Sequence, residues 1–375
     1  MTTEARRFLF FFMLLFSFPL TAPAGEGENT IEFKDSPYPM AVKFSVDDKT
    51  GAQIFESALS EPPQFEYDTV LVQGEMPDHA LLIVISIVSK TRPDGVDKFR
   101  QLTVRRFPSG RFWAKYQTDQ PTSQPVKLSV VNMGSKSSGE LIIYGVELSK
   151  EILLRENKET ISTAPYNPDP SLYLSDNTPF KITRRTGWNA AAPKEPYTPH
   201  SPVIFTLHHT AGYYPKNYRE ALAEIQFIQD YHQNAKGWID IGYHFLISPQ
   251  GDVFEGRPIG VVGAHALDWN TGNTGISIMG NYHPPVSTPV TPEIMSSMVA
   301  VGKYMKDTYS VSVSSFYAHR ELGQTDCPGN DLYARMPEFK KLIFAPQPPA
   351  PAASKALNQL IDSLNRRITA DIAFD

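Results

Sequence analysis

Two different patterns of apolar residues divide this chain of 375 residues near position 200, and together they limit its fold more than any other feature. From about residue 201, strand-like apolar runs alternate with segments that carry apolar residues at helical spacing. This alternation predicts a mixed α/β sheet with helices packed on it. Residues 65–150 instead hold several short strand-like runs separated by turn residues, which predicts an all-β, sandwich-like domain.

A proline-rich segment lies between the two patterns. Seven of the 32 prolines of the chain fall between residues 151 and 200, and proline fixes φ and removes a backbone donor. We therefore expect a linker at 151–179 that precedes an α/β domain at 180–344. The flanking parts are predicted to be an N-terminal arm at 25–64 and, at 345–375, a Pro/Ala spacer followed by an amphipathic helix.

Turn and capping residues place individual elements within the two predicted domains. Pro108-Ser109-Gly110 separates two strand-like runs, and the segment 249–252 separates two more, so each predicts a β-hairpin. Thr291 followed by Pro292 is typical of the start of a helix. We expect one last helix over 331–343.

The first residues have the order of a secretory signal peptide. Arg6 and Arg7 precede the apolar run FLFFFMLLF, and Ala22-Pro23-Ala24 follows it. We predict a signal peptide at 1–24, export to the periplasm or the extracellular space, and no stable membrane insertion after cleavage. The apolar run is too short to span a bilayer, and no later segment of the sequence reaches that length.

The charge of the exported part argues against nucleic acid as a partner. Removing residues 1–24 takes away Arg6, Arg7 and Glu4, so basic residues fall from 35 to 33, acidic residues fall from 40 to 39, and the net charge changes from −5 to −6. Proteins that bind nucleic acid usually carry basic patches.

Cys327 is the single cysteine of the sequence. A chain with one thiol cannot form an internal disulfide. Outside the cytosol such a residue is a free thiol, half of an intermolecular disulfide, or a protected group, of which a metal thiolate is one case.

Histidines occur where they could join this cysteine at a metal. His208 and His209 end the apolar run VIFTL, and His319 precedes Cys327 by seven intervening residues. Neighbouring residues on a strand point to opposite faces, so only one of the adjacent histidines can face a given ion. Two histidines, one thiolate and an open fourth position form a hydrolytic type of zinc site.

Four motifs in order resemble the superfamily of peptidoglycan recognition proteins and zinc-dependent N-acetylmuramoyl-L-alanine amidases. They are IFTLHHTAG, WIDIGYHFLISPQGDVFEGR, VVGAHALDWNTGNTGISIMGNY and AHRELGQTDCPGNDLY, and the resemblance covers roughly 180–344. It implies hydrolysis of the amide between the lactyl group of muramic acid and L-alanine in peptidoglycan. It also implies Zn²⁺ as the cofactor, held by His208, His319 and Cys327, because cleaving members use the first histidine of the pair.

The same resemblance implies further site residues. Tyr243 matches a tyrosine that cleaving members use beside the metal, and Thr325 matches a threonine of recognition-type amidases. His265 and Arg257 resemble substrate-binding residues. Ser277 stands where cytosolic anhydro-muropeptide amidases carry a glutamate base, which favours the recognition-protein side.

One departure from the family concerns the stem peptide. Members that prefer diaminopimelate stems often read GRGW, whereas this chain reads Gly256-Arg257-Pro258-Ile259. Proline removes a backbone donor, and isoleucine cannot donate as an indole does. The departure predicts weak discrimination between diaminopimelate and lysine stems.

Other functions fit part of the sequence. One is a module that binds peptidoglycan without cleaving it, and another is a structural wall-anchored protein in which the β domain and the tail do the work. The aromatic residues Phe112, Trp113 and Tyr116 could form a wall-binding face or simply the core of the β domain. The resemblance implies peptidoglycan and muropeptides as partners, and the sequence indicates no particular oligomeric state.

Overall fold

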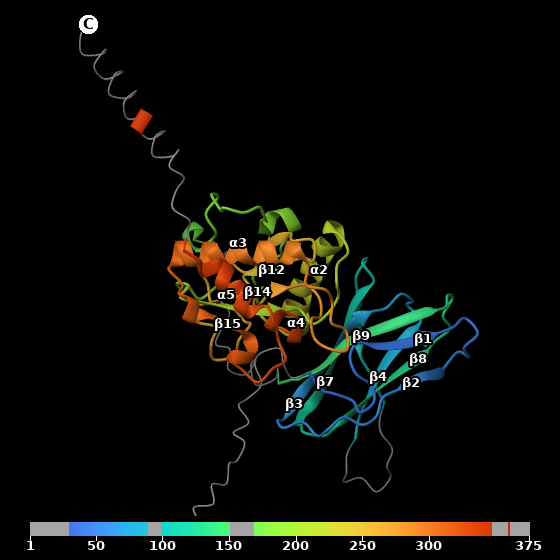
Figure 1. Ribbon diagram of the computed structural model, residues 1–375. Coiled ribbons are helices and arrows are strands. Elements are labelled where there is room, and N and C mark those ends of the chain that lie inside the picture. The colour runs from blue at the N-terminus through green and yellow to red at the C-terminus, as the bar shows by residue number, and fades with distance from the viewer. Residues whose placement is uncertain (1–29, 89–98, 151–168, 347–358, 361–375) are drawn as a thin grey trace, which may run out of the picture.

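The computed structural model describes residues 30–88, 99–150, 169–346 and 359–360 (Figure 1). The predicted signal peptide, most of the predicted linker and nearly all of the predicted C-terminal helix lie outside the described residues. Within the described ranges, no helix has both the length and the apolar character needed to cross a membrane.

The N-terminal part consists of two antiparallel sheets, one of five strands in the order β1-β9-β3-β7-β6 and one of four in the order β2-β8-β4-β5. Their strands are β1 (Met40–Phe44), β2 (Ala52–Glu56), β3 (Tyr67–Glu75), β4 (Leu81–Ile87), β5 (Phe99–Gln101), β6 (Thr103–Arg106), β7 (Arg111–Thr122), β8 (Val126–Asn132) and β9 (Gly139–Ser149). Apolar residues of both sheets meet in one core, to which Val72 and Leu141 contribute from the first sheet and Ile83 and Val130 from the second.

The structure starts this domain earlier than the sequence suggests. Strands β1 and β2 lie inside the segment 25–64 that was expected to be an arm, and they pair with β9 and β8. Strand β1 alternates buried and exposed residues over only five positions, so its two-residue period is too short to stand out in the sequence.

The predicted hairpin around Gly110 is confirmed. Strands β6 and β7 pair antiparallel, and Gly110 has a φ of +86°, which favours glycine. The aromatic residues that follow belong to the interior: Phe112 is fully buried and Trp113 is 7% exposed. They do not form an exposed wall-binding face.

The C-terminal part is a mixed sheet of six strands with helices packed on it, as predicted. The strand order is β10-β13-β12-β14-β11-β15, and β13 runs antiparallel to β12 in the second predicted hairpin. Strands β11, β12, β14 and β15 are parallel to one another. The strands are β10 (Ile182–Thr183), β11 (Ile204–His209), β12 (Phe245–Ile247), β13 (Val253–Glu255), β14 (Asn273–Ile278) and β15 (Phe316–Ala318).

Helices cover both faces of this sheet. Helix α2 (Tyr218–Asp230) packs with Leu246 and Phe254 on one face, while α3 (Pro292–Tyr309) and α5 (Met336–Phe344) pack with Leu207 on the other. The hydroxyl of Thr291 accepts a hydrogen bond from the Ile294 amide, which confirms the predicted helix start. Shorter helical turns are η1 (Pro170–Leu172), η2 (Arg185–Trp188), the π-helical turn η3 (Tyr231–Ala235), η4 (Val313–Ser315) and η5 (His319–Glu321).

The expectation of one last helix over 331–343 is wrong. The structure divides this stretch into α4 (Asn330–Tyr333) and α5, and Pro337 lies in the first turn of α5. Proline inside a continuous helix would lack a donor and clash with the preceding turn, whereas the first turn tolerates it.

The two domains lie side by side (Figure 1), and strand β7 contacts α2 and η3. Nε1 of Trp113 donates to a carboxylate oxygen of Asp230 at 2.8 Å, and Arg111 forms a buried ion pair with Glu224. The β domain is therefore joined to the α/β domain through side chains.

Candidate active site

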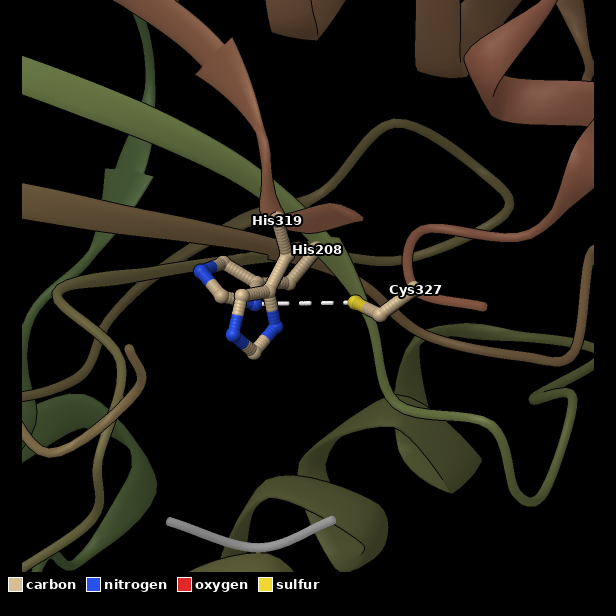
Figure 2. Close-up of side chains that lie close together, drawn as sticks. All are labelled: His208, His319 and Cys327. Carbon is tan, nitrogen blue, oxygen red and sulfur yellow. Dashed lines mark hydrogen bonds between the residues drawn. The ribbon is translucent and has the colours of Figure 1, made fainter. Parts of the chain in front are cut away.

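Three predicted metal ligands come together at one edge of the six-stranded sheet. His208 lies on β11, and His319 follows directly after β15, which is parallel to β11 and next to it. Because the carboxyl ends of neighbouring parallel strands share an edge, the two rings approach one another, with centroids 4.4 Å apart. Potential ligand atoms of His208, His319 and Cys327 all lie within 4.8 Å of one another (Figure 2).

Local hydrogen bonds hold Cys327 close to His319. The chain turns at η5, and the amide of Arg320 donates to the Cys327 carbonyl at 2.9 Å. The Cys327 amide in turn donates to Oγ1 of Thr325 at 3.0 Å. The seven residues between His319 and Cys327 thus form a loop whose ends lie close together, as expected from their spacing.

The adjacent histidines have different surroundings. Nδ1 of His208 lies 3.6 Å from Sγ of Cys327 (Figure 2). Nδ1 of His209 instead accepts a hydrogen bond from the Tyr282 amide at 3.3 Å. The structure therefore places His208, and not His209, in the cluster with Cys327.

The donor set fits a divalent zinc ion. Bond lengths of about 2.0 Å to nitrogen and about 2.3 Å to sulfur separate the two atoms by about 3.5 Å in a tetrahedron, and the 3.6 Å between His208 Nδ1 and Cys327 Sγ is close to this value. Burial lowers the pKa of His208 well below its ordinary value, so the ring is neutral and one nitrogen carries a lone pair. Two imidazoles and one thiol are ligands that zinc prefers.

His265 determines which nitrogen of His208 has that lone pair. Burial lowers the pKa of His265 to about 3, and its Nε2 lies 3.1 Å from the Asn273 carbonyl, which can only accept. Nδ1 of His265 is then the acceptor, and Nε2 of His208, 3.0 Å away, donates to it. The lone pair of His208 is therefore on Nδ1, the atom that faces Cys327.

A cavity of about 700 Å³ opens over this cluster, and its lining includes His319, Cys327, Tyr243, Thr325 and His265. The ring of Tyr243 lies 5.3 Å from that of His208. His208 itself is 1% exposed and lies beneath the lining. The cavity has a volume typical of a ligand site.

Arg257 is not part of this cavity, which corrects its predicted role in substrate binding. The residue is 3% exposed, and its guanidinium donates to three backbone carbonyls, those of Ile241, Val262 and Asp240. The neighbouring Pro258 and Ile259 are buried as well. Arg257 therefore stabilises loops, and the stretch from Gly256 to Ile259 does not line the cavity.

Residues of the β domain also line the cavity, and sequence reasoning did not find them. Arg111, Tyr144 and Glu147 are among them. Every residue of the segment 30–38 except Ile31 also lines the cavity. No motif connects these positions with the α/β domain. One signal was present: Glu224 is an acid on the apolar face of α2, where a buried partner is required.

The fold and this cluster define an α/β domain with a candidate metal-dependent hydrolase site. Residues 198–330 match the family described as N-acetylmuramoyl-L-alanine amidase. Peptidoglycan-recognition protein SC2 of Drosophila melanogaster is 39% identical over 127 residues, which are 34% of this chain and 68% of that protein. The chain belongs to the superfamily of peptidoglycan recognition proteins and N-acetylmuramoyl-L-alanine amidases.

Two further proteins are similar to part of this chain. The human N-acetylmuramoyl-L-alanine amidase is 34% identical over 185 residues, which are 46% of this chain and 30% of that protein. Among solved structures, Drosophila peptidoglycan recognition protein SD aligns at 26% identity with a TM-score of 0.39, and the alignment covers 41% of this chain and 91% of that one.

Proposed function

We propose that this chain is an exported zinc-dependent amidase that hydrolyses the amide between the lactyl group of N-acetylmuramic acid and L-alanine in peptidoglycan. The observation that carries the proposal is the convergence of His208, His319 and Cys327 at the base of a cavity that Tyr243 also lines. The names of the relatives, which are recognition proteins and an amidase, support the same substrate class.

Nδ1 of His208, a ring nitrogen of His319 and Sγ of Cys327 would hold the zinc. When bound, zinc supplies a Lewis acid that polarises the scissile carbonyl and lowers the pKa of a water molecule. Cys327 serves as a thiolate in such a site, which accounts for a lone cysteine in an exported protein.

The protein side chains orient the reacting groups. His265 accepts from Nε2 of His208 and fixes the ring of that ligand. Tyr243 faces the same space, where its phenol can donate to the oxyanion that develops as the amide is attacked. Thr325 also lines the cavity, and its Oγ1 accepts the hydrogen bond from the amide of the ligand Cys327.

The direct test is to incubate the purified protein with peptidoglycan sacculi, with and without a chelator, and to identify the products. The proposal expects free stem peptides that begin with L-alanine, no release after chelation, and recovery when zinc is added. Reducing sugars as the only products would indicate glycosidic cleavage and contradict it. Binding to sacculi without any release would instead favour a recognition module that does not cleave.

A further inference from the structure

The cavity over the metal cluster has a second wall that comes from another domain. The α/β domain contributes the candidate catalytic groups to its lining, and the β domain contributes further lining residues. The β-domain lining consists of Thr30, Glu32, Phe33, Lys34, Asp35, Ser36, Pro37, Tyr38, Gln73, Arg111, Tyr144, Gly145 and Glu147. A substrate that fills this cavity therefore contacts both domains.

A buried ion pair holds this wall in place. Arg111 on β7 donates through Nε to Glu224 of α2 at 2.8 Å and through Nη2 at 3.2 Å, and both side chains are 2% exposed. The guanidinium also lies 3.9 Å from the ring centre of Phe227. A bidentate buried pair has a fixed geometry, so the β domain is positioned against α2 and not loosely tethered to it.

A second cluster pairs the charges of Glu147 and Lys236 at this junction. Glu147 on β9 pairs with Lys236, and the Tyr231 hydroxyl donates to Glu147 at 2.9 Å. Lys236 also lies 5.1 Å from the ring centre of Trp238. Arg111 and Lys236 are thus bound within the protein and are not available to a ligand.

The segment Thr30–Tyr38 carries charges that stay available to a ligand. Glu32, Lys34 and Asp35 are exposed and line the cavity. Within the described residues, Lys34 is the one lysine or arginine of the lining that forms no ion pair. The segment itself is anchored, because Phe33 is 4% exposed and the Tyr38 hydroxyl accepts a hydrogen bond from the Val146 amide of β9 at 3.1 Å.

We propose that this segment is a specificity-determining surface for the peptide stem, in which Lys34 binds a stem carboxylate and Glu32 and Asp35 bind a stem amine. The inference rests on the proposed function, because it takes the muropeptide as the ligand. Stem peptides with a diamino acid present both charges, and an anchored wall with both signs is complementary to them. Discrimination among stems then depends on the β domain, in place of the buried stretch around Arg257.

The test uses the full chain and a muramoyl tripeptide whose third residue is diaminopimelate. Lys34→Met should raise KM about twofold to fivefold without changing kcat, as expected for one partly exposed charge contact. Lys34→Glu should raise KM further, and both effects should shrink at high salt. Lys49→Met and Lys49→Glu are matched controls, because Lys49 is exposed on the same domain and does not line the cavity.

Calorimetric titration of the metal-free protein gives a readout that does not depend on turnover, and Kd should follow the same order as KM. Asp35→Asn should weaken binding of a stem with a free amine more than binding of its N-acetylated form. Asn suits this position because Asp35 has a φ of +63°.

Equal Kd values for wild type, Lys34→Met and Lys34→Glu would overturn the assignment of Lys34, whatever the turnover. If the wild-type protein binds the tripeptide but does not cleave it, only the proposed amidase activity is contradicted. The Kd values of the variants then still test the role of the segment Thr30–Tyr38 in stem binding. A wild-type protein that does neither would overturn both proposals.

Discussion

Nε2 of His208 lies 3.0 Å from Nδ1 of His265, so a residue outside the predicted ligand set holds one of the ligands. Removing such a partner typically lowers metal affinity about 10- to 100-fold. We therefore expect His265→Ala to bind zinc more weakly by that factor while it stays folded. Competition with a chromophoric chelator measures the affinity.

A histidine away from the cluster provides the control for His265→Ala. His200 is bonded through its ring to the Ile259 carbonyl and the Gly272 amide, so His200→Ala should lower stability and leave zinc affinity unchanged. Equal zinc affinity for His265→Ala and wild type would show that the contact between the two rings does not position the ligand.

The two adjacent histidines should respond differently to substitution. His208→Ala is expected to lose metal and activity together, because it removes a donor of the cluster. His209→Ala should keep stoichiometric metal and most activity, with a loss of about 1–3 kcal/mol of stability because the buried Tyr282 amide loses its acceptor. Metal analysis and thermal unfolding separate the two effects, and equal metal loss in two folded variants would contradict the assignment.

The phenol of Tyr243 is expected to act in the chemical step and not in metal binding. Tyr243→Phe should lower kcat about a hundredfold to a thousandfold, the usual effect of removing one donor to an oxyanion, with zinc content unchanged. Tyr317→Phe is a suitable control, because Tyr317 lies on β15 and does not line the cavity. Unchanged kcat in Tyr243→Phe would remove the residue from the proposed mechanism.

Removing one partner of the buried ion pair between Arg111 and Glu224 should strongly destabilise the domain junction. Arg111→Met leaves a carboxylate buried without its partner, which typically costs about 3–5 kcal/mol. Arg111→Met combined with Glu224→Met should regain much of that loss, because an apolar pair of similar volume needs no charge compensation. Denaturant unfolding of both variants measures the difference.

An exposed ion pair serves as the control for this experiment. Arg335 and Glu338 lie 3.1 Å apart with side chains about half exposed, so Arg335→Met should cost less than about 1 kcal/mol. A cost for Arg111→Met as small as for Arg335→Met would mean that the junction is not held by this pair. We also expect residues 180–375 alone to be less stable than the full chain, because Glu224 loses its partner Arg111 when the β domain is removed.

The sequence predicted what depends on local pattern. The alternation of strands and helices, both hairpins and the cap at Thr291 follow from period and turn chemistry, and they are present in the structure. The convergence of His208, His319 and Cys327 was implied by motifs that resemble a known family. The break at Pro337 was missed because apolar spacing continues across it.

What the sequence did not predict depends on contacts between distant segments. Arg257 follows a strand in a polar loop, and only the fold shows that three carbonyls surround its guanidinium. The wall formed by Thr30–Tyr38 lies at least 170 residues away from His208 in the chain, and no periodicity links the two. Pairing across a domain junction is a property of packing, so local patterns do not encode it.

The most direct test of the central claim is the site of bond cleavage in one defined muropeptide. The zinc-loaded protein is incubated with a muramoyl tripeptide in heavy-oxygen water, and the products are analysed by mass spectrometry. The account predicts a tripeptide with a free N-terminal L-alanine and a single heavy-oxygen atom in the lactyl carboxylate, with neither product formed by His208→Ala. A lactyl carboxylate without the heavy oxygen, or cleavage within the peptide, would contradict it.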